Sequence, residues 1–267
     1  MSITIHQQEN NIFKEYIAEL HESLAVVQDG LHYLGDLQYS NDTNCWGRKP
    51  GNEENLWQQI CGKKRGLVVI TKDINDDSAW DIRMEHGLKN GCKKKVPTNH
   101  LFYRRLRTWI YGLLSIGPDG KMPKFPEVDM AQDLFENSPW VRVNLKKALG
   151  YGSISNKELQ SYINRFKPLL LRQLQLYKEA SIYLDCTRKN GIGLLKELYD
   201  DLKPFIPGDS KTTGEDEWIF YSENHRFIVV NSYHPSFRCS NEKEIEYYNN
   251  MKEAVEQFFK EYPNFFG

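Results

Sequence analysis

Leu67-Val68-Val69-Ile70 is the stretch of sequence on which the fold prediction rests. A continuous run of apolar residues, most of them β-branched, is typical of a strand that is buried on both faces of a sheet. Arg65-Gly66 precedes the run and Asp73-Ile74-Asn75-Asp76 follows it, so turn-forming residues bound it on both sides. The run therefore predicts a central strand of a largely parallel sheet.

Four further segments have the composition of strands and lie at residues 140–145, 180–185, 217–221 and 226–231. Helical patterns occur at 78–88, 101–114, 156–177, 193–202 and 241 to about 262. Ser155 with Glu158, and Asn241 with Glu244, resemble capping boxes at two helix starts. Because strands alternate with helices, we expect an α/β fold with three α/β/α layers and a central, mostly parallel sheet of four strands. The segment 217–221 would be a fifth strand beside 226–231.

Residues 1–60 have a different pattern. Apolar residues near helical spacing predict a helix from about 11 to 29, and a short helix is expected at 54–59. The stretch 34–52 is rich in turn-forming residues and predicts a long loop. We expect a helical N-terminal extension over 1–60, packed on an α/β domain over 61–267, with both parts in a single structural unit.

The composition is typical of a soluble globular chain, with 40% hydrophobic and 27% charged residues among 267. It has no apolar run of membrane-spanning length and no signal-like N-terminus, so we expect a cytoplasmic monomer without membrane contacts. The five cysteines include no C-x-x-C pair, so we expect no metal and no cofactor. The net charge of −1 gives no global basic field, although Lys and Arg gather at 63–65, 93–95 and 104–107.

Ligands of open α/β sheets bind beyond the carboxyl ends of the strands. In this chain the rule selects residues 71–77, 144–147 and 232–240. In the first segment the carboxylate of Asp73 could orient a water or stabilise positive charge on a sugar. Asp76 or Asp77 would serve instead as a cap for the helix that follows.

Asn144 and His234 belong to the other two segments. The Asn144 amide offers one acceptor and two donors in a plane, which suits the edge of a base, although it would suit the tethering of a loop equally well. A histidine such as His234 can donate a hydrogen bond to a base that leaves with negative charge, and the Ser236 hydroxyl can bind a phosphate. The tripeptide His234-Pro235-Ser236 also occurs as an ordinary structural turn.

A strand with an Asp loop, a strand ending in Asn and a strand ending in His-Pro-Ser, in this order, resemble the uracil-DNA glycosylase superfamily. His86-Gly87-Leu88 matches the end of a helix that follows the Asp loop in that family. Residues 96–105 match its Pro-led helix with a tyrosine and basic residues. The resemblance extends from about Leu67 to Arg238.

The resemblance implies a role for each matching residue. Asp73 would position or activate the attacking water, His234 would stabilise the departing base, and Asn144 would read its edge. Ser236 would bind a phosphate next to the flipped nucleotide. Further contacts to DNA would come from Lys72, Lys146, Lys147, Phe237 and Arg238.

Departures from the family pattern indicate a different base. Where the family has Pro and Tyr after the Asp, this chain has Ile74 and Asn75, and the family's base-stacking Phe is Asn90. A smaller, more polar pocket wall, with Trp80 just beyond the Asp loop, suggests a base larger or more polar than uracil. A glucosylated or otherwise hypermodified pyrimidine, as handled by an antiphage branch of the superfamily, would fit.

The sequence therefore predicts a metal-independent, monofunctional DNA glycosylase whose partner is DNA. One alternative is a repair enzyme that excises uracil, and another is an inactive binder of modified or abasic DNA. An unrelated α/β hydrolase is a third, although the chain lacks a Gly-x-Ser-x-Gly elbow. A lyase activity would use Lys72 as the amine nucleophile.

Overall fold

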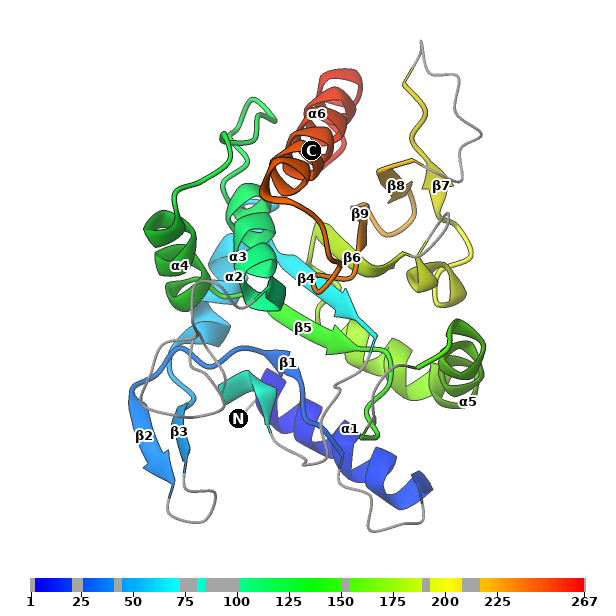
Figure 1. Ribbon diagram of the computed structural model, residues 1–267. Coiled ribbons are helices and arrows are strands. Elements are labelled where there is room, and N and C mark those ends of the chain that lie inside the picture. Colours follow the sequence, from blue (N-terminus) through cyan, green and yellow to red (C-terminus); the bar gives the residue numbers. More distant parts are fainter. Residues whose placement is uncertain are drawn as a thin grey trace.

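The protein is built around a seven-stranded sheet, shown in the computed structural model of Figure 1. The structure describes residues 3–20, 26–40, 45–72, 81–84, 101–149, 154–188, 193–207 and 217–266. The strand order is β1-β5-β4-β6-β9-β8-β7. The strands are β1 (Gly30–Leu31), β4 (Leu67–Thr71), β5 (Val141–Asn144), β6 (Ile182–Arg188), β7 (Lys203–Pro204), β8 (Ile219–Ser222) and β9 (Phe227–Tyr233).

The centre of the sheet is parallel, which confirms the α/β class. The strands β5, β4, β6 and β9 are the four that the sequence predicts, and each runs parallel to its central neighbours. The expected total of four strands is wrong, because β1, β8 and β7 extend the sheet through antiparallel pairs. β8 lies where a fifth strand was expected. β1 and β7 have two residues each, too few to produce a periodic pattern.

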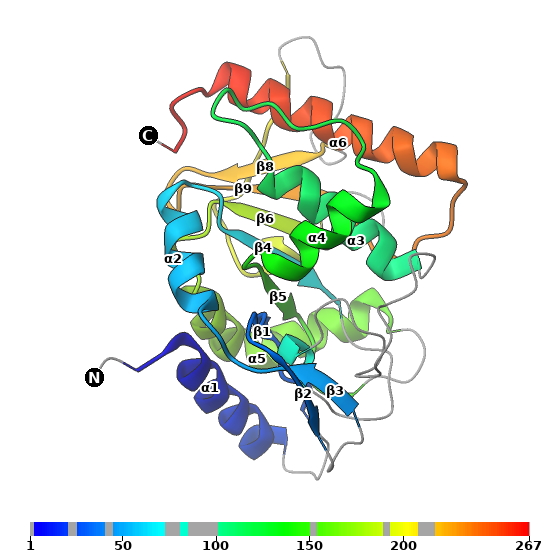
Figure 2. The ribbon, with the colours of Figure 1, turned by 90° about the vertical axis from the view of Figure 1, so that its left-hand side faces the viewer.

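Helices cover both faces of the sheet (Figure 2). On one face lie α3 (Leu101–Leu114), α4 (Val128–Asn137) and α6 (Asn241–Glu261). On the other lie α2 (Glu53–Gly62) and α5 (Asn156–Gln175), and α1 (Ile5–Leu20) packs against α5. None of the helices that the structure describes is long and apolar enough to span a membrane.

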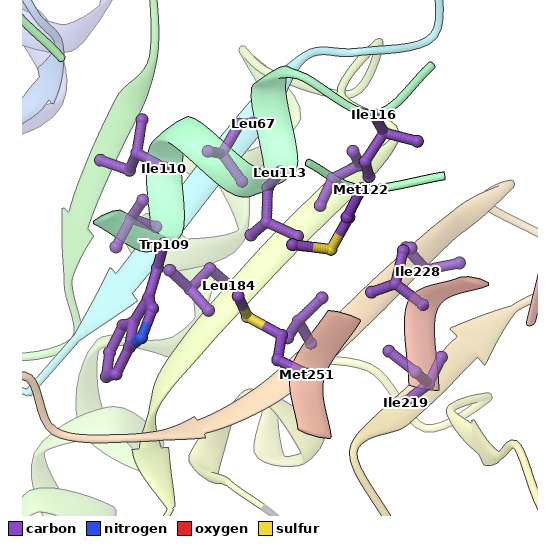
Figure 3. Close-up of a cluster of buried hydrophobic side chains, with 14 of the residues drawn as sticks. Leu67, Trp109, Ile110, Leu113, Ile116, Met122, Leu184, Ile219, Ile228 and Met251 are labelled. Atoms are coloured by element: carbon purple, nitrogen blue, oxygen red, sulfur yellow. The ribbon is translucent and has the colours of Figure 1, made fainter. Parts of the chain in front are cut away.

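Each face of the sheet has its own hydrophobic core. Leu67 and Val69 of β4 belong to the core under α3 and α6, whereas Val68 and Ile70 belong to the core under α5. Successive side chains of a strand point to opposite faces, so a strand covered on both sides is apolar at every position. Figure 3 shows the first of these cores, where side chains of α3 and α6 surround Leu184 of β6.

Some helix bounds agree with the sequence and others do not. The helix at 101–114 is confirmed, and the capping box of Ser155 opens α5 as expected. The cap of α6 is Ser240, whose side chain accepts from Lys243, rather than Asn241. The expected helix at 193–202 is wrong, since this stretch contains only the 3₁₀ turn η3 (Leu194–Glu197). The sequence did not predict α4.

The N-terminal region is only partly helical. Its first helix spans 5–20 rather than 11–29, and the expected long loop contains a hairpin of β2 (Leu37–Ser40) and β3 (Cys45–Arg48). β1 pairs with β5 and so adds a strand to the central sheet. Residues 1–60 thus contribute directly to the sheet, in addition to the helix that packs on its outside.

Candidate active site

The carboxyl ends of the four central strands lie side by side at one edge of the sheet. Thr71, the last residue of β4, is in register with Asn144, the last of β5, and Figure 1 shows both arrowheads at this edge. On the other side of β4, Arg188 at the end of β6 is in register with Tyr233 of β9. His234 follows directly, so the expected base-reading amide and the expected imidazole belong to the same edge.

Asn144 is fully buried, and its surroundings orient its amide. Its backbone N–H donates to Asp29 at 2.7 Å, and its side-chain oxygen accepts from the Thr71 hydroxyl. Its side-chain nitrogen has no hydrogen-bond partner among the described residues. A buried amide nitrogen without a partner costs free energy unless a ligand or water completes it. The oxygen is therefore used within the sheet, whereas the nitrogen, which no described residue uses, can donate to a ligand.

A series of contacts connects Asn144 with His234. Arg142 lies two residues before Asn144, on the same face of β5, and its Nε donates to the Thr71 hydroxyl oxygen at 3.2 Å. The centre of its guanidinium lies 4.9 Å from the centre of the Phe102 ring. That ring lies 5.6 Å from the imidazole of His234. The two candidate residues are thus linked through the first turn of α3.

His234 is a neutral imidazole with a defined tautomer. The backbone N–H of Ser236 donates to Nδ1 at 3.3 Å, so Nδ1 is an acceptor and the ring proton belongs to Nε2. Burial, and then the positive charges of Arg142 and Lys72, lower the pKa of His234 to about 4. At neutral pH the ring therefore offers an uncharged Nε2–H donor, which can stabilise negative charge on a leaving group.

Arg105 of α3 anchors the His-Pro-Ser loop through its guanidinium group. It is buried on α3, and its guanidinium donates to the Pro235 carbonyl oxygen at 3.1 Å and to the Cys239 sulfur at 2.9 Å. Glu244 of α6 lies 3.4 Å from its Nε and also pairs with Arg104. The sequence had placed Arg105 in a basic cluster of the kind found on solvated surfaces, and this anchoring role was missed.

The loop presents its next three residues at the surface. Ser236, Phe237 and Arg238 are exposed, with Phe237 at 41%. The Phe237 ring stacks on Tyr233 at 5.4 Å between ring centres and contacts Tyr247 of α6 edge-on at 5.9 Å. An exposed aromatic side chain that packs against two others therefore lies close in sequence to the partly buried imidazole of His234.

The three lysines expected to contact DNA lie in different surroundings. Lys147 is fully buried, and its ammonium lies 2.6 Å from both carboxylate oxygens of Asp29. A phosphate contact is therefore wrong for Lys147, because its charge is compensated inside the protein. Lys72 and Lys146 are partly exposed, and the Lys72 ammonium donates to Asn156 at the start of α5 at 3.2 Å.

Four sequence candidates lie outside the described residues: Asp73, Asn75, Trp80 and Asn90. The short segment 81–84, which follows the first three, is described and is held by Arg83. The buried guanidinium of Arg83 donates to Glu9 of α1 at 2.6 Å and to Asp81 at 2.8 Å. The chain beyond the Asp loop is thus anchored to the N-terminal helix.

The structure adds Arg142 and Phe102 to the site. The sequence did contain a signal for the first, since Arg142 is the one charged residue in the strand 140–145. A charge within an otherwise buried strand is rare unless it is paired or functional. Phe102 had no comparable signal, because an aromatic residue on an amphipathic helix is usually part of the core.

The described residues contain no group of three or more His, Cys, Asp or Glu that could hold a metal ion. Comparisons of the chain with protein-family models, curated proteins and solved structures find no match. A functional assignment therefore has to rest on the residues and the geometry described above.

Proposed function

We propose that this protein is a DNA glycosylase that flips a non-standard base out of DNA and hydrolyses its N-glycosidic bond, leaving an abasic site. The observation that carries the proposal is that Asn144 and His234 belong to the same edge of the sheet, where the first has an amide nitrogen without a described partner and the second an Nε2–H donor. The order of the motifs along the chain, which resembles that of the uracil-DNA glycosylase superfamily, supports the same proposal.

The chemistry requires stabilisation of two opposite charges. As the glycosidic bond breaks, its electron pair moves to the base and a positive charge develops on the sugar. His234 donates from Nε2 to the base, and Asn144 donates from its side-chain nitrogen to the base edge. Asp73, which comes two residues after the end of β4, orients the water that adds to the sugar.

The surface beside His234 would bind the DNA strand. Ser236 and Arg238 are exposed and would contact phosphates, and the Phe237 ring would fill the stack that the flipped base has left. Lys72 and Lys146 lie at the ends of the neighbouring strands. These contacts would offset the few kcal/mol that base extrusion costs.

The target that we propose is a modified pyrimidine, such as glucosylated hydroxymethylcytosine in phage DNA. This choice rests on Asn75 and Asn90, which replace bulky pocket residues of the family with small polar ones. An enzyme with this target would act in antiviral defence. A repair enzyme acting on plain uracil is the competing possibility.

The test is mass spectrometry of the bases released from duplexes that carry uracil, hydroxymethylcytosine or glucosylated hydroxymethylcytosine. We expect release of the glucosylated base by the wild type and a loss of at least about 100-fold for His234→Ala. His225→Ala is the matched control, because His225 is exposed at the opposite end of β9. Preferential release of uracil would refute the modified-base assignment.

The inactive-binder alternative gives a different pattern in the same experiment. Tight binding of modified or abasic DNA without base release, unchanged by Asp73→Asn, would favour it over catalysis. Strand scission without added base or heat would indicate a lyase, with Lys72→Ala as the variant that should abolish it.

A further inference from the structure

Arg142 occupies a position where a positive charge is costly. It lies in the middle of β5, a central strand of the sheet, and is only 6% exposed. Val141 and Val143 on either side of it point into the core under α5. Removing a guanidinium from water costs several kcal/mol unless an opposite charge compensates it.

No such compensation exists within the described part of the chain. The Nε of Arg142 donates to the Thr71 hydroxyl, and its flat face lies on the Phe102 ring. No described carboxylate pairs with it, and no described acceptor takes the bonds of its two terminal amino groups. Arg142 differs in this respect from Lys147, a buried cation that is paired with Asp29.

The surroundings of Arg142 select the kind of ligand. The unpartnered amide nitrogen of Asn144 lies on the same face of the same strand. Among the described residues, Arg142 and Lys72 are close enough to His234 for their charges to lower its pKa, so all three belong to one region. Among the described residues, the amide nitrogen of Asn144 and the terminal amino groups of Arg142 are hydrogen-bond donors that no described acceptor uses, so a ligand that binds them must present acceptors or negative charge.

We propose that Arg142 is a catalytic residue of this site that binds the acceptor edge of the extruded base and takes up the negative charge of the base as it leaves. This inference rests on the proposed function. The C1′–N bond breaks with its electron pair moving to the base, which departs as an anion. Water adds to the sugar cation and gives up a proton, which balances the charge of the base. The two terminal amino groups of the guanidinium act as fixed donors to the base.

The first experiment measures how base release depends on the acidity of the leaving base. We expect Arg142→Gln to slow release by about 100-fold, as removal of one donor to a developing anion does elsewhere. The loss should be smaller on DNA that carries 5-fluorouracil than on DNA that carries uracil, because the electron-withdrawing fluorine stabilises the base anion. Arg142→Lys should recover part of the rate, since it keeps the charge but not the fork of donors. An equal loss for both bases would overturn the proposal, because a structural role does not depend on the leaving group.

The second experiment needs no catalysis. Free 5-nitrouracil is an anion at neutral pH and free uracil is neutral, so their affinities, measured by calorimetry, report on an anion site. We expect the wild type to prefer the nitro base and Arg142→Gln to lose that preference. Arg65→Gln is the control, because Arg65 is a partly buried arginine just before β4, at the opposite edge of the sheet. If the wild type shows no preference, or Arg142→Gln keeps it, the proposal fails. If the preference is present but no DNA base is released, the anion site stands and the glycosylase function fails.

Discussion

At the scale of single residues, the candidate site combines groups that are each unfavourable where they stand. Asn144 has a buried amide nitrogen without a described partner, Arg142 has a buried charge, and His234 is kept neutral by burial and by neighbouring positive charges. Active sites keep such unfavourable groups because a ligand or a transition state forms the interactions that the free protein lacks. The costs should be measurable in the free protein.

The titration of His234 should make the protein less stable in mild acid. Its pKa is about 4 in the folded state and 6.5 in an unfolded chain, so the unfolded state binds more protons between these values. The free energy of unfolding should therefore fall as the pH drops from 6.5 to 4. Urea titrations of wild type and His234→Gln should show a smaller fall for the variant. An equal fall in the free energy of unfolding of the two proteins would contradict a neutral His234 in the folded state.

At the scale of elements, the helices α3 and α1 anchor segments that follow strands of the site. Arg105 of α3 bonds to both ends of the loop after β9. On the other side, His6 of α1 bridges Glu9 at 2.9 Å and Glu53 of α2 at 2.8 Å, and Glu9 in turn receives a bond from Arg83. The loop after β9 and the segment 81–84 are therefore held by helices that are distant from them in sequence.

Replacing Arg105 with Met should loosen the His-Pro-Ser loop. Two hydrogen bonds are lost, and we expect a destabilisation of about 1–3 kcal/mol together with slower base release. Arg104→Met is the matched control, because Arg104 pairs with the same Glu244 but is not bonded to the loop. Thermal unfolding and single-turnover rates measure the two effects. Equal loss of activity in both variants would show that Glu244, rather than the loop contact, matters.

The bridge made by His6 predicts a loss of stability in alkali. Burial opposes protonation, but the hydrogen bonds and charges of Glu53 and Glu9 raise the pKa of His6 to about 9. A raised pKa in the folded state contributes stability that is complete below 6.5 and is lost as the pH rises through 9. Melting temperatures should therefore drop over this range in the wild type but not in His6→Gln. A flat profile for the wild type would mean that the bridge is not ionic.

At the scale of the whole molecule, the N-terminal region and the sheet are tied together at one buried carboxylate. Asp29 accepts from the Asn144 backbone, from the Lys147 ammonium and from the Gln173 amide of α5. β1, which follows Asp29 directly, pairs with β5. Residues 1–60 therefore hold β5 and Asn144 in position, in addition to packing on the outside of the sheet.

Asp29→Asn should destabilise the whole protein, because it leaves the Lys147 charge buried without a partner. Breaking a buried ion pair costs about 3–5 kcal/mol. The double variant Asp29→Asn/Lys147→Met should be more stable than Asp29→Asn, since it removes the orphaned charge as well. Urea unfolding of the three proteins gives the coupling. A double variant that is less stable than Asp29→Asn would argue against the ion pair as the cause.

Local patterns in the sequence determined the central strands and several of the helices. The central strands, the bounds of α3 and the cap of α5 follow from periodicity, β-branched runs and a capping box, which act within a few residues. The alternation of strands and helices was enough to predict that Asn144 and His234 belong to one edge, because parallel strands end on the same side.

Only the tertiary structure decided which charges are used inside the protein and which remain for a ligand. In the sequence, Lys147 and Arg105 look like ordinary surface cations. In the structure, Lys147 pairs with Asp29, and Arg105 anchors a loop about 130 residues away in sequence. The two-residue strands β1 and β7 likewise exist only through their partners. Burial and pairing depend on segments that are distant along the chain, and a local pattern carries no information about them.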